Sequence, residues 1–305
     1  MSLAESVRQR LLNLSKSQNE TFDLMLTLFG MERLLYRLSR SQWKNEFVLK
    51  GAILFRIWDG SPHRPTRDLD LMGFINNDVE GMRRIFQSIC QTEVENDGIV
   101  FLPESVQCDE IREGNLYQGI RVRLIAELAG ARIRLQVDVG FGDTVIPEPV
   151  NIVFPTLLEL PAPRLLAYSR YSVVSEKFHA LVILGIINSR MKDFYDLWLL
   201  IQKFDFSGSI LNKAIHSTFR RRHTEIPREV PLALTDSFSS DEYKTTQWNA
   251  FLKKNNLESE AEDLTTTIQI LHDFLMPPVL SLAHNKPFTQ SWSPPGPWSN
   301  NENVD

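Results

Sequence analysis

Two stretches in the first quarter of the chain decide the fold: FVLKGAILF at residues 47–55 and RPTRDLDLM at residues 64–72. The first predicts a short buried strand, a tight turn at Lys50-Gly51-Ala52 and a helix. The second begins in a loop rich in turn formers and then alternates as a strand does. This segment therefore has the predicted order strand, glycine turn, helix, strand.

Asp68 and Asp70 carry the sharpest chemical signal in the sequence. Side chains two apart on a strand project to the same face, so two carboxylates lie side by side. Such a pair is tolerated when one acid is protonated or when a divalent cation sits between them, and carboxylate oxygens suit magnesium. Asp138, on the polar face of a predicted strand at 132–141, could add a third carboxylate. Three acids would hold two metal ions.

The turn at Lys50-Gly51-Ala52 has the character of a phosphate-binding turn. Glycine lets the backbone approach a phosphate closely, and the N-terminus of the following helix favours an anion. Taken alone, each motif also has an ordinary structural explanation, such as a surface pair of aspartates. Their order and spacing favour a triphosphate at the turn with metal ions at the aspartates.

The chain is predicted to be an α+β protein with two domains and a tail. Residues 1–160 combine N-terminal helices with a small mixed β-sheet that carries the aspartates. Strand signals stop near Pro161, and residues 161–282 are expected to form a helical C-terminal domain. Residues 283–305 are rich in proline and polar residues, which predicts an extended or disordered tail.

Composition narrows the possible classes of protein. The 305 residues carry a net charge of −5, which excludes a wholly basic nucleic-acid coat. Two cysteines, Cys90 and Cys108, cannot form a disulfide framework. No secretory signal is expected at the N-terminus, and the longest apolar run is too short to cross a membrane. We therefore expect a cytoplasmic protein without a membrane partner.

The two opening stretches resemble the first motif of the AbiEii-type nucleotidyltransferase toxins, known from abortive infection and type IV toxin–antitoxin systems, within the DNA polymerase beta-like superfamily. A second stretch is also similar to this family: EKFHA at residues 176–180, followed by RMKDFYDL at 190–197. These two segments resemble the paired helical motifs of the family. The resemblance covers about residues 5–280 and leaves out the tail.

The resemblance implies transfer of a nucleoside monophosphate from a nucleoside triphosphate to an acceptor hydroxyl, with release of pyrophosphate. Two Mg²⁺ ions, or Mn²⁺, would be held by Asp68, Asp70 and Asp138. Lys177 would neutralise phosphate charge in the transition state, and the catalytic set would be Asp68, Asp70, Lys177 and Asp193. Nucleotide-binding positions would be Lys50, Gly51, Ala52, Arg67, Lys177, Arg190 and Asp196. The active cleft is expected between the two domains.

Spacing alone leaves other interpretations of the second motif open. Lys177 could be a solvated charge, and Asp193 could simply complement a helix dipole. Asp196 could form a surface pair with Lys192. At the phosphate turn, Ala52 stands where many nucleotidyltransferases have serine, so a hydroxyl contact to phosphate is lost.

A basic run, Arg220-Arg221-Arg222, stands out in this acidic chain and could hold an RNA backbone. The resemblance implies the acceptor end of transfer RNA as substrate and a cognate antitoxin as partner. Two alternatives stay open: nucleotidyl transfer to a protein or a small molecule, and a catalytically silent binding module of the same fold. The sequence does not identify the nucleotide, the acceptor or the oligomeric state.

Overall fold

The computed structural model describes residues 2–58, 64–76, 78–113 and 117–300. The chain divides into two compact units. Unit 1 comprises Met1–Asp143 with Pro149–Tyr168, and unit 2 comprises Thr144–Glu148 with Ser169–Asp305. The predicted boundary after residue 160 therefore lies eight residues too early, and the short segment 144–148 belongs to the second unit.

Unit 1 is an α+β structure, as predicted, and its sheet is larger than the small sheet expected. Its helices are α1 (Leu3–Ser17), α2 (Phe22–Arg40), the 3₁₀ turn η1 (Ala52–Leu54), α3 (Phe55–Trp58) and α4 (Val79–Cys90). Its strands are β1 (Phe47–Lys50), β2 (Asp68–Gly73), β3 (Val100–Glu113), β4 (Tyr117–Leu128), β5 (Ala131–Phe141), β6 (Val150–Val153) and β7 (Arg164–Ala167).

The described strands of unit 1 form one mixed sheet in the order β3-β4-β5-β2-β1-β7-β6. Strand β2 pairs parallel with β5 and antiparallel with β1, so the aspartate strand lies at the centre of the sheet. Strand β7 pairs parallel with β1 and antiparallel with the end strand β6. Sequence patterning missed β6 and β7, because four-residue strands are too short to show a clear alternation and neither is followed by a glycine turn, as β1 is.

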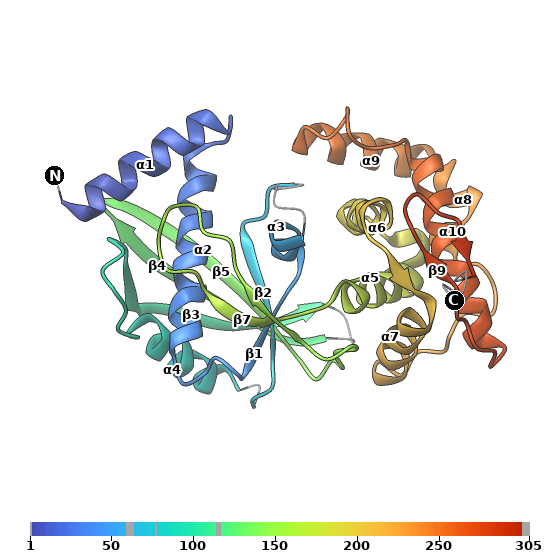
Figure 1. Cartoon of the computed structure of the whole chain (residues 1–305), viewed down its shortest axis with the longest axis horizontal. Coiled ribbons are helices and arrows are strands. Elements are labelled where there is room, and N and C mark those ends of the chain that lie inside the picture. Colours follow the sequence, from blue (N-terminus) through green and yellow to red (C-terminus); the bar gives the residue numbers. More distant parts are fainter. Residues whose placement is uncertain (1, 59–63, 77, 114–116, 301–305) are drawn as a thin grey trace, which may run out of the picture. The chain divides into compact units, whose positions relative to one another are not determined.

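Helix α2 covers one face of this sheet (Figure 1). A Cβ at Gly30 would lie 3.1 Å from Leu135 and 3.2 Å from Ile133, so glycine lets the helix approach β5 closely. Thr21 caps the helix by accepting a hydrogen bond from the N–H of Leu24. Because Ile133 and Leu135 face α2, Asp138 projects from the opposite face of β5.

Unit 2 is mainly helical, as predicted. Its helices are α5 (Arg170–Leu184), η2 (Gly185–Ile187), α6 (Met191–Lys203), α7 (Gly208–Arg221), η3 (Leu232–Leu234), α8 (Asp236–Ser239), α9 (Glu242–Asn255) and α10 (Leu264–Ala283). Helix α5 packs on α7, and α10 packs on α6 and α7. Within the described residues, no helix is long and apolar enough to span a membrane.

Of the two alternatives predicted for the tail, disorder is wrong for residues up to 300, where the chain is extended and forms two short strands. Strands β9 (Ser291–Trp292) and β10 (Trp298–Ser299) join β8 (Phe206–Ser207) in a small antiparallel sheet. Trp292 is buried and donates to the carbonyl of Ile201, and the Trp298 ring stacks on Phe274. The tail is held by aromatic side chains, which its proline and polar composition obscured.

Candidate functional site

Charged side chains form a row across the centre of the unit 1 sheet. Lys50 on β1 lies opposite Asp70 on β2, and Asp70 lies opposite Asp138 on β5. Arg121 on β4 continues the row opposite Asp138. Residues in register on neighbouring strands share a face, so all four project from the face opposite α2. The structure therefore brings together two of the three predicted metal ligands and the predicted phosphate-turn lysine.

The glycine turn directly contacts the Asp70 carboxylate. Gly51 has φ +78°, a conformation that favours glycine, and a Cβ at this position would lie 2.0 Å from Asp70 Oδ2. Any side chain at position 51 would therefore displace the carboxylate. This contact confirms that the two motifs quoted from the sequence meet in space.

The phosphate turn begins with a 3₁₀ segment. Ala52 is the first of three 3₁₀ residues, and the described residues of α3 follow directly up to Trp58. The potential phosphate contacts of this turn are the backbone N–H groups and the ammonium group of Lys50.

Lys50 is largely buried beside the turn. Its Nζ lies 3.7 Å from Asp143 Oδ2 and 5.5 Å from the centre of the Tyr168 ring. Arg67, the residue before β2, is by contrast exposed and pairs with Asp23 in the first turn of α2. Of these two predicted nucleotide-binding residues, only Lys50 stands in the charged row.

Asp138, the third predicted metal ligand, forms an ion pair with Arg121. The guanidinium group donates two hydrogen bonds to the carboxylate: Nε is 2.8 Å from Oδ1 and Nη2 is 2.7 Å from Oδ2. Among the described residues, no group of three or more His, Cys, Asp or Glu side chains is arranged to hold a metal ion. The sequence could not show this pairing, because it depends on the register between β4 and β5.

Asp68 and Asp70 nevertheless fit a magnesium ion by their chemistry. Both carboxylates project from the same face of the six-residue strand β2. Magnesium is commonly held by one or two carboxylates, with waters and substrate phosphates completing its octahedron. The donor set in unit 1 therefore suits Mg²⁺ held by two protein carboxylates, and Asp138 as a further ligand stays a prediction.

Unit 2 contains a buried cluster around Lys177 of α5. Its Nζ lies 2.6 Å from Asp193 Oδ1 and 2.8 Å from Asp196 Oδ2, both on α6. The two aspartate side chains are 1% and 0% exposed, and that of Lys177 is 15% exposed. The alternatives of a solvated lysine and a surface Lys192–Asp196 pair are therefore wrong.

Arg190 completes this cluster at the start of α6. Its Nε lies 2.8 Å from Asp193 Oδ2, so the Asp193 carboxylate joins Lys177 and Arg190. The turn before the helix is fixed by Asn188, whose Oδ1 accepts a hydrogen bond from the N–H of Arg190. The buried Lys244 of α9 donates to the Asn188 carbonyl at 2.9 Å. Sequence reasoning missed Asn188 and Lys244, since neither belongs to a recognisable motif.

The basic run at the end of α7 divides into two parts. Arg220 and Arg221 are exposed, whereas Arg222 turns inward. Its side chain is 8% exposed, with Nη2 3.8 Å from Glu176 Oε2 and Nη1 3.1 Å from His179 Nδ1. Burial lowers the pKa of Arg222 to about 10. The predicted RNA-binding role is therefore wrong for Arg222, which packs α7 against α5.

Comparison with known proteins identifies a family that matches this chain. A family model for the nucleotidyl transferase AbiEii toxins of type IV toxin–antitoxin systems matches residues 33–270. Among solved structures, JHP933 from Helicobacter pylori is 15% identical, with 90% of each chain covered and a TM-score of 0.44. A presumed nucleotidyltransferase from H. pylori is 13% identical, with 90% of this chain and 93% of that chain covered and a TM-score of 0.42.

No protein of curated function matches the chain. The span matched by the family model nevertheless includes the glycine turn, the aspartate strand and the Lys177 cluster. That span is most of the chain, and it confirms the resemblance seen in the sequence. The chain belongs to the AbiEii family of nucleotidyl transferase toxins of type IV toxin–antitoxin systems and is a nucleotidyltransferase.

Proposed function

We propose that this enzyme transfers a nucleoside monophosphate from a nucleoside triphosphate to a hydroxyl at the acceptor end of transfer RNA, in a metal-dependent reaction. The acceptor oxygen forms a bond to the α-phosphorus while the bond from that phosphorus to the bridging oxygen breaks. Pyrophosphate leaves with the electron pair of that bond, and the hydroxyl proton passes to solvent. The observation that carries the proposal is the contact between the Gly51 turn and Asp70.

Asp68 and Asp70 are the carboxylates proposed to hold Mg²⁺. When bound, the metal would polarise the attacking hydroxyl and the triphosphate. The strand holds both carboxylates on one face, and the absence of a side chain at Gly51 leaves room for the Asp70 carboxylate beside the turn. A two-ion site, with Mg²⁺ or Mn²⁺, would also require Asp138 to exchange Arg121 for a metal ion.

The turn at Lys50-Gly51-Ala52 is proposed to bind the triphosphate through its backbone N–H groups and the Lys50 ammonium. Ala52 is buried at 8% exposure, so its side chain takes no part in that contact. Because residue 52 is alanine, the turn lacks the serine hydroxyl that many nucleotidyltransferases have at this position. Arg67 is exposed and would reach a nucleotide only by leaving Asp23.

Lys177 is proposed to neutralise phosphate charge as it develops in the transition state. Two buried carboxylates hold its ammonium group, which restricts it to one position. Asp193 and Asp196 then act as positioning residues, since their oxygens bind Lys177 and Arg190. Arg190, whose side chain is 44% exposed, is the member of this cluster best placed to contact a phosphate.

The acceptor is tested by incubating the protein with each of four α-labelled nucleoside triphosphates, Mg²⁺ and separate pools of small RNA, protein and aminoglycosides. We expect label on RNA of transfer RNA size, from one or two of the nucleotides. Label confined to protein or small molecules would refute the RNA acceptor. Absence of label in every pool would refute the catalytic proposal and favour a binding module.

The family also bears on partners. Its members are toxins of toxin–antitoxin systems, so we propose a cognate antitoxin for this chain. The test is to express this chain in cells whose growth it arrests and to co-express each neighbouring reading frame. Recovery of growth with one of these frames would support the antitoxin. Failure of every frame to restore growth would contradict it.

A further inference from the structure

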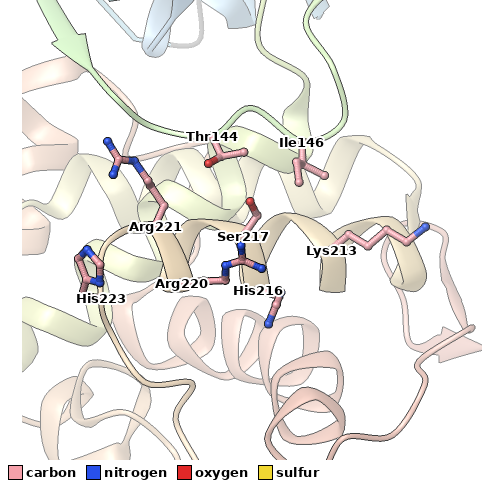
Figure 2. A pocket seen from close by; sticks show the side chains of 8 residues that line it. All are labelled: Thr144, Ile146, Lys213, His216, Ser217, Arg220, Arg221 and His223. Carbon is pink, nitrogen blue, oxygen red and sulfur yellow. The ribbon is translucent and has the colours of Figure 1, made fainter.

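Helix α7 carries a basic pocket within unit 2. The pocket encloses about 500 Å³. It is lined by Thr144, Ile146, Lys213, His216, Ser217, Arg220, Arg221 and His223 (Figure 2). The five positions on α7 follow the pattern i, i+3, i+4, i+7 and i+8, so they form one face of the helix. Ser172 on α5 donates to the Ile146 carbonyl at 2.9 Å and anchors the segment that forms the other wall.

The lining of this pocket is cationic. Lys213, Arg220 and Arg221 carry three positive charges, two histidines lie beside them, and none of the eight lining residues is acidic. The chain as a whole has a net charge of −5, so this concentration runs against its overall balance. A favourable helix dipole accounts for Arg220 and Arg221 in the last turn, but not for Lys213, which lies nearer the helix start.

The length of this basic face of α7 indicates the kind of anion that it suits. Lys213 and Arg221 lie at opposite ends of the face in Figure 2. They are eight residues apart, which is about 12 Å along a helix. Each strand of a DNA duplex carries one phosphate per about 3.4 Å of helix axis, so a basic face of this length can contact more than one phosphate. Arginine guanidinium groups bind phosphate oxygens with two parallel hydrogen bonds, and Ser217 and Thr144 add hydroxyl donors.

We propose that this pocket, the α7 pocket, binds the sugar–phosphate backbone of the acceptor RNA. The inference rests on the proposed function for the choice of RNA, and it assigns the docking to residues other than the aspartates and the glycine turn. Its residues differ from the basic run in the sequence. Arg222 is excluded by burial, whereas Lys213 and Ser217 are added because they share a helix face with Arg220 and Arg221.

The test is fluorescence anisotropy with a labelled transfer RNA, without metal or nucleotide, across a series of NaCl concentrations. The variant is Lys213→Gln/Arg220→Gln/Arg221→Gln. The logarithm of the association constant falls linearly as the logarithm of the NaCl concentration rises. Loss of three phosphate contacts should make this negative slope shallower by about 2 to 3. We expect affinity at 0.1 M NaCl to fall by at least about tenfold.

A matched control is available at the end of α9. Lys253 and Lys254 are exposed and occupy the last turn of their helix, as Arg220 and Arg221 do in α7. We expect Lys253→Gln/Lys254→Gln to retain affinity and slope. Equal losses in both variants would show a general charge effect and overturn the assignment. An unchanged slope in the α7 variant would do the same, provided that its thermal unfolding matches the parent.

Two further measurements distinguish RNA from an acidic protein as the ligand, and this RNA site from the nucleotide site. Polyglutamate that competes with RNA equally well, at matched charge, would overturn the RNA assignment in favour of an acidic protein. Binding of a fluorescent nucleoside triphosphate with Mg²⁺ should survive in the α7 variant and be lost in Asp70→Asn. Loss of nucleotide binding in the α7 variant would contradict a separate RNA site, whereas retained binding in Asp70→Asn would count against the proposed function alone.

Discussion

Arg121 holds both carboxylate oxygens of Asp138, on the strand next to the one that carries Asp70. In this structure the charge of Asp138, the predicted third metal ligand, is therefore balanced by the guanidinium group of Arg121. Arg121 and a metal ion compete for the same two oxygens. The pair provides a way to separate a structural from a metal-binding role for Asp138.

We expect Arg121→Gln to tighten Mn²⁺ binding several-fold, because it frees Asp138 as a ligand beside Asp70. Titration followed by electron paramagnetic resonance measures free Mn²⁺ without reference to activity. Arg123→Gln is the matched control: Arg123 lies two residues away on the same strand face and pairs with Asp109. If both variants bind Mn²⁺ equally, the effect is one of net charge and Asp138 is not a ligand.

Gly51→Ala should destabilise the fold and move Asp70. Gly51 has φ +78° and ψ −166°, a backbone region essentially restricted to glycine that costs an alanine about 1 to 3 kcal/mol, and the added Cβ would overlap the Asp70 carboxylate. Gly130→Ala is a close control, because Gly130 has φ +80° and nothing within 4 Å of an added Cβ. We expect urea unfolding to show a larger loss of stability in Gly51→Ala than in Gly130→Ala. Nucleotidyl transfer should fall in Gly51→Ala alone. Equal losses of stability would argue against a tight contact between the turn and Asp70.

The Lys177 cluster allows stability and catalysis to be separated. Lys177→Ala leaves two buried carboxylates without their lysine, which should cost about 3 to 5 kcal/mol. The variant Lys177→Met/Asp193→Asn/Asp196→Asn removes the charges of the lysine and of both aspartates and should recover much of that stability. We expect it to stay inactive in nucleotidyl transfer. Substantial turnover in this triple variant would show that these three residues are only structural.

His179 should make stability depend on pH. Burial lowers its pKa below the ordinary value of 6.5, against a smaller opposing effect of Glu176. Its Nδ1 faces Arg222, and its Nε2 lies 2.9 Å from Thr224 Oγ1, so the neutral ring is the form that packs. The unfolded chain takes up the proton first as pH falls, so the stabilisation is present above about pH 6.5 and is lost below it.

Urea unfolding between pH 7.5 and pH 5 checks this expectation. His179→Gln should remove part of the acid destabilisation, whereas His272→Gln, at a partly exposed histidine, should leave the profile unchanged. A profile in His179→Gln identical to that of the parent would contradict a neutral buried ring at this position.

The parts of the site that the sequence predicted are those set by local geometry. Alternation along β2 placed Asp68 and Asp70 on one face, and glycine at position 51 indicated a special turn. The partner of Asp138 depends on strand register, and the inward turn of Arg222 depends on the packing of α5 against α7. Neither is a local property of the chain. The sequence did not exclude a disordered tail for a similar reason, since the carbonyl to which Trp292 donates belongs to Ile201, far away in sequence.

The most direct test of metal-dependent transfer compares Asp68→Ala with Asp109→Ala in a labelled-nucleotide assay with Mg²⁺ and small RNA. Asp109 is an exposed aspartate on β3 of the same sheet and pairs with Arg123, which makes it a matched control. We predict that Asp68→Ala lowers transfer by at least about a hundredfold while its unfolding curve stays that of the parent, and that Asp109→Ala retains activity. Transfer by folded Asp68→Ala at the parental rate would contradict the aspartate-based mechanism.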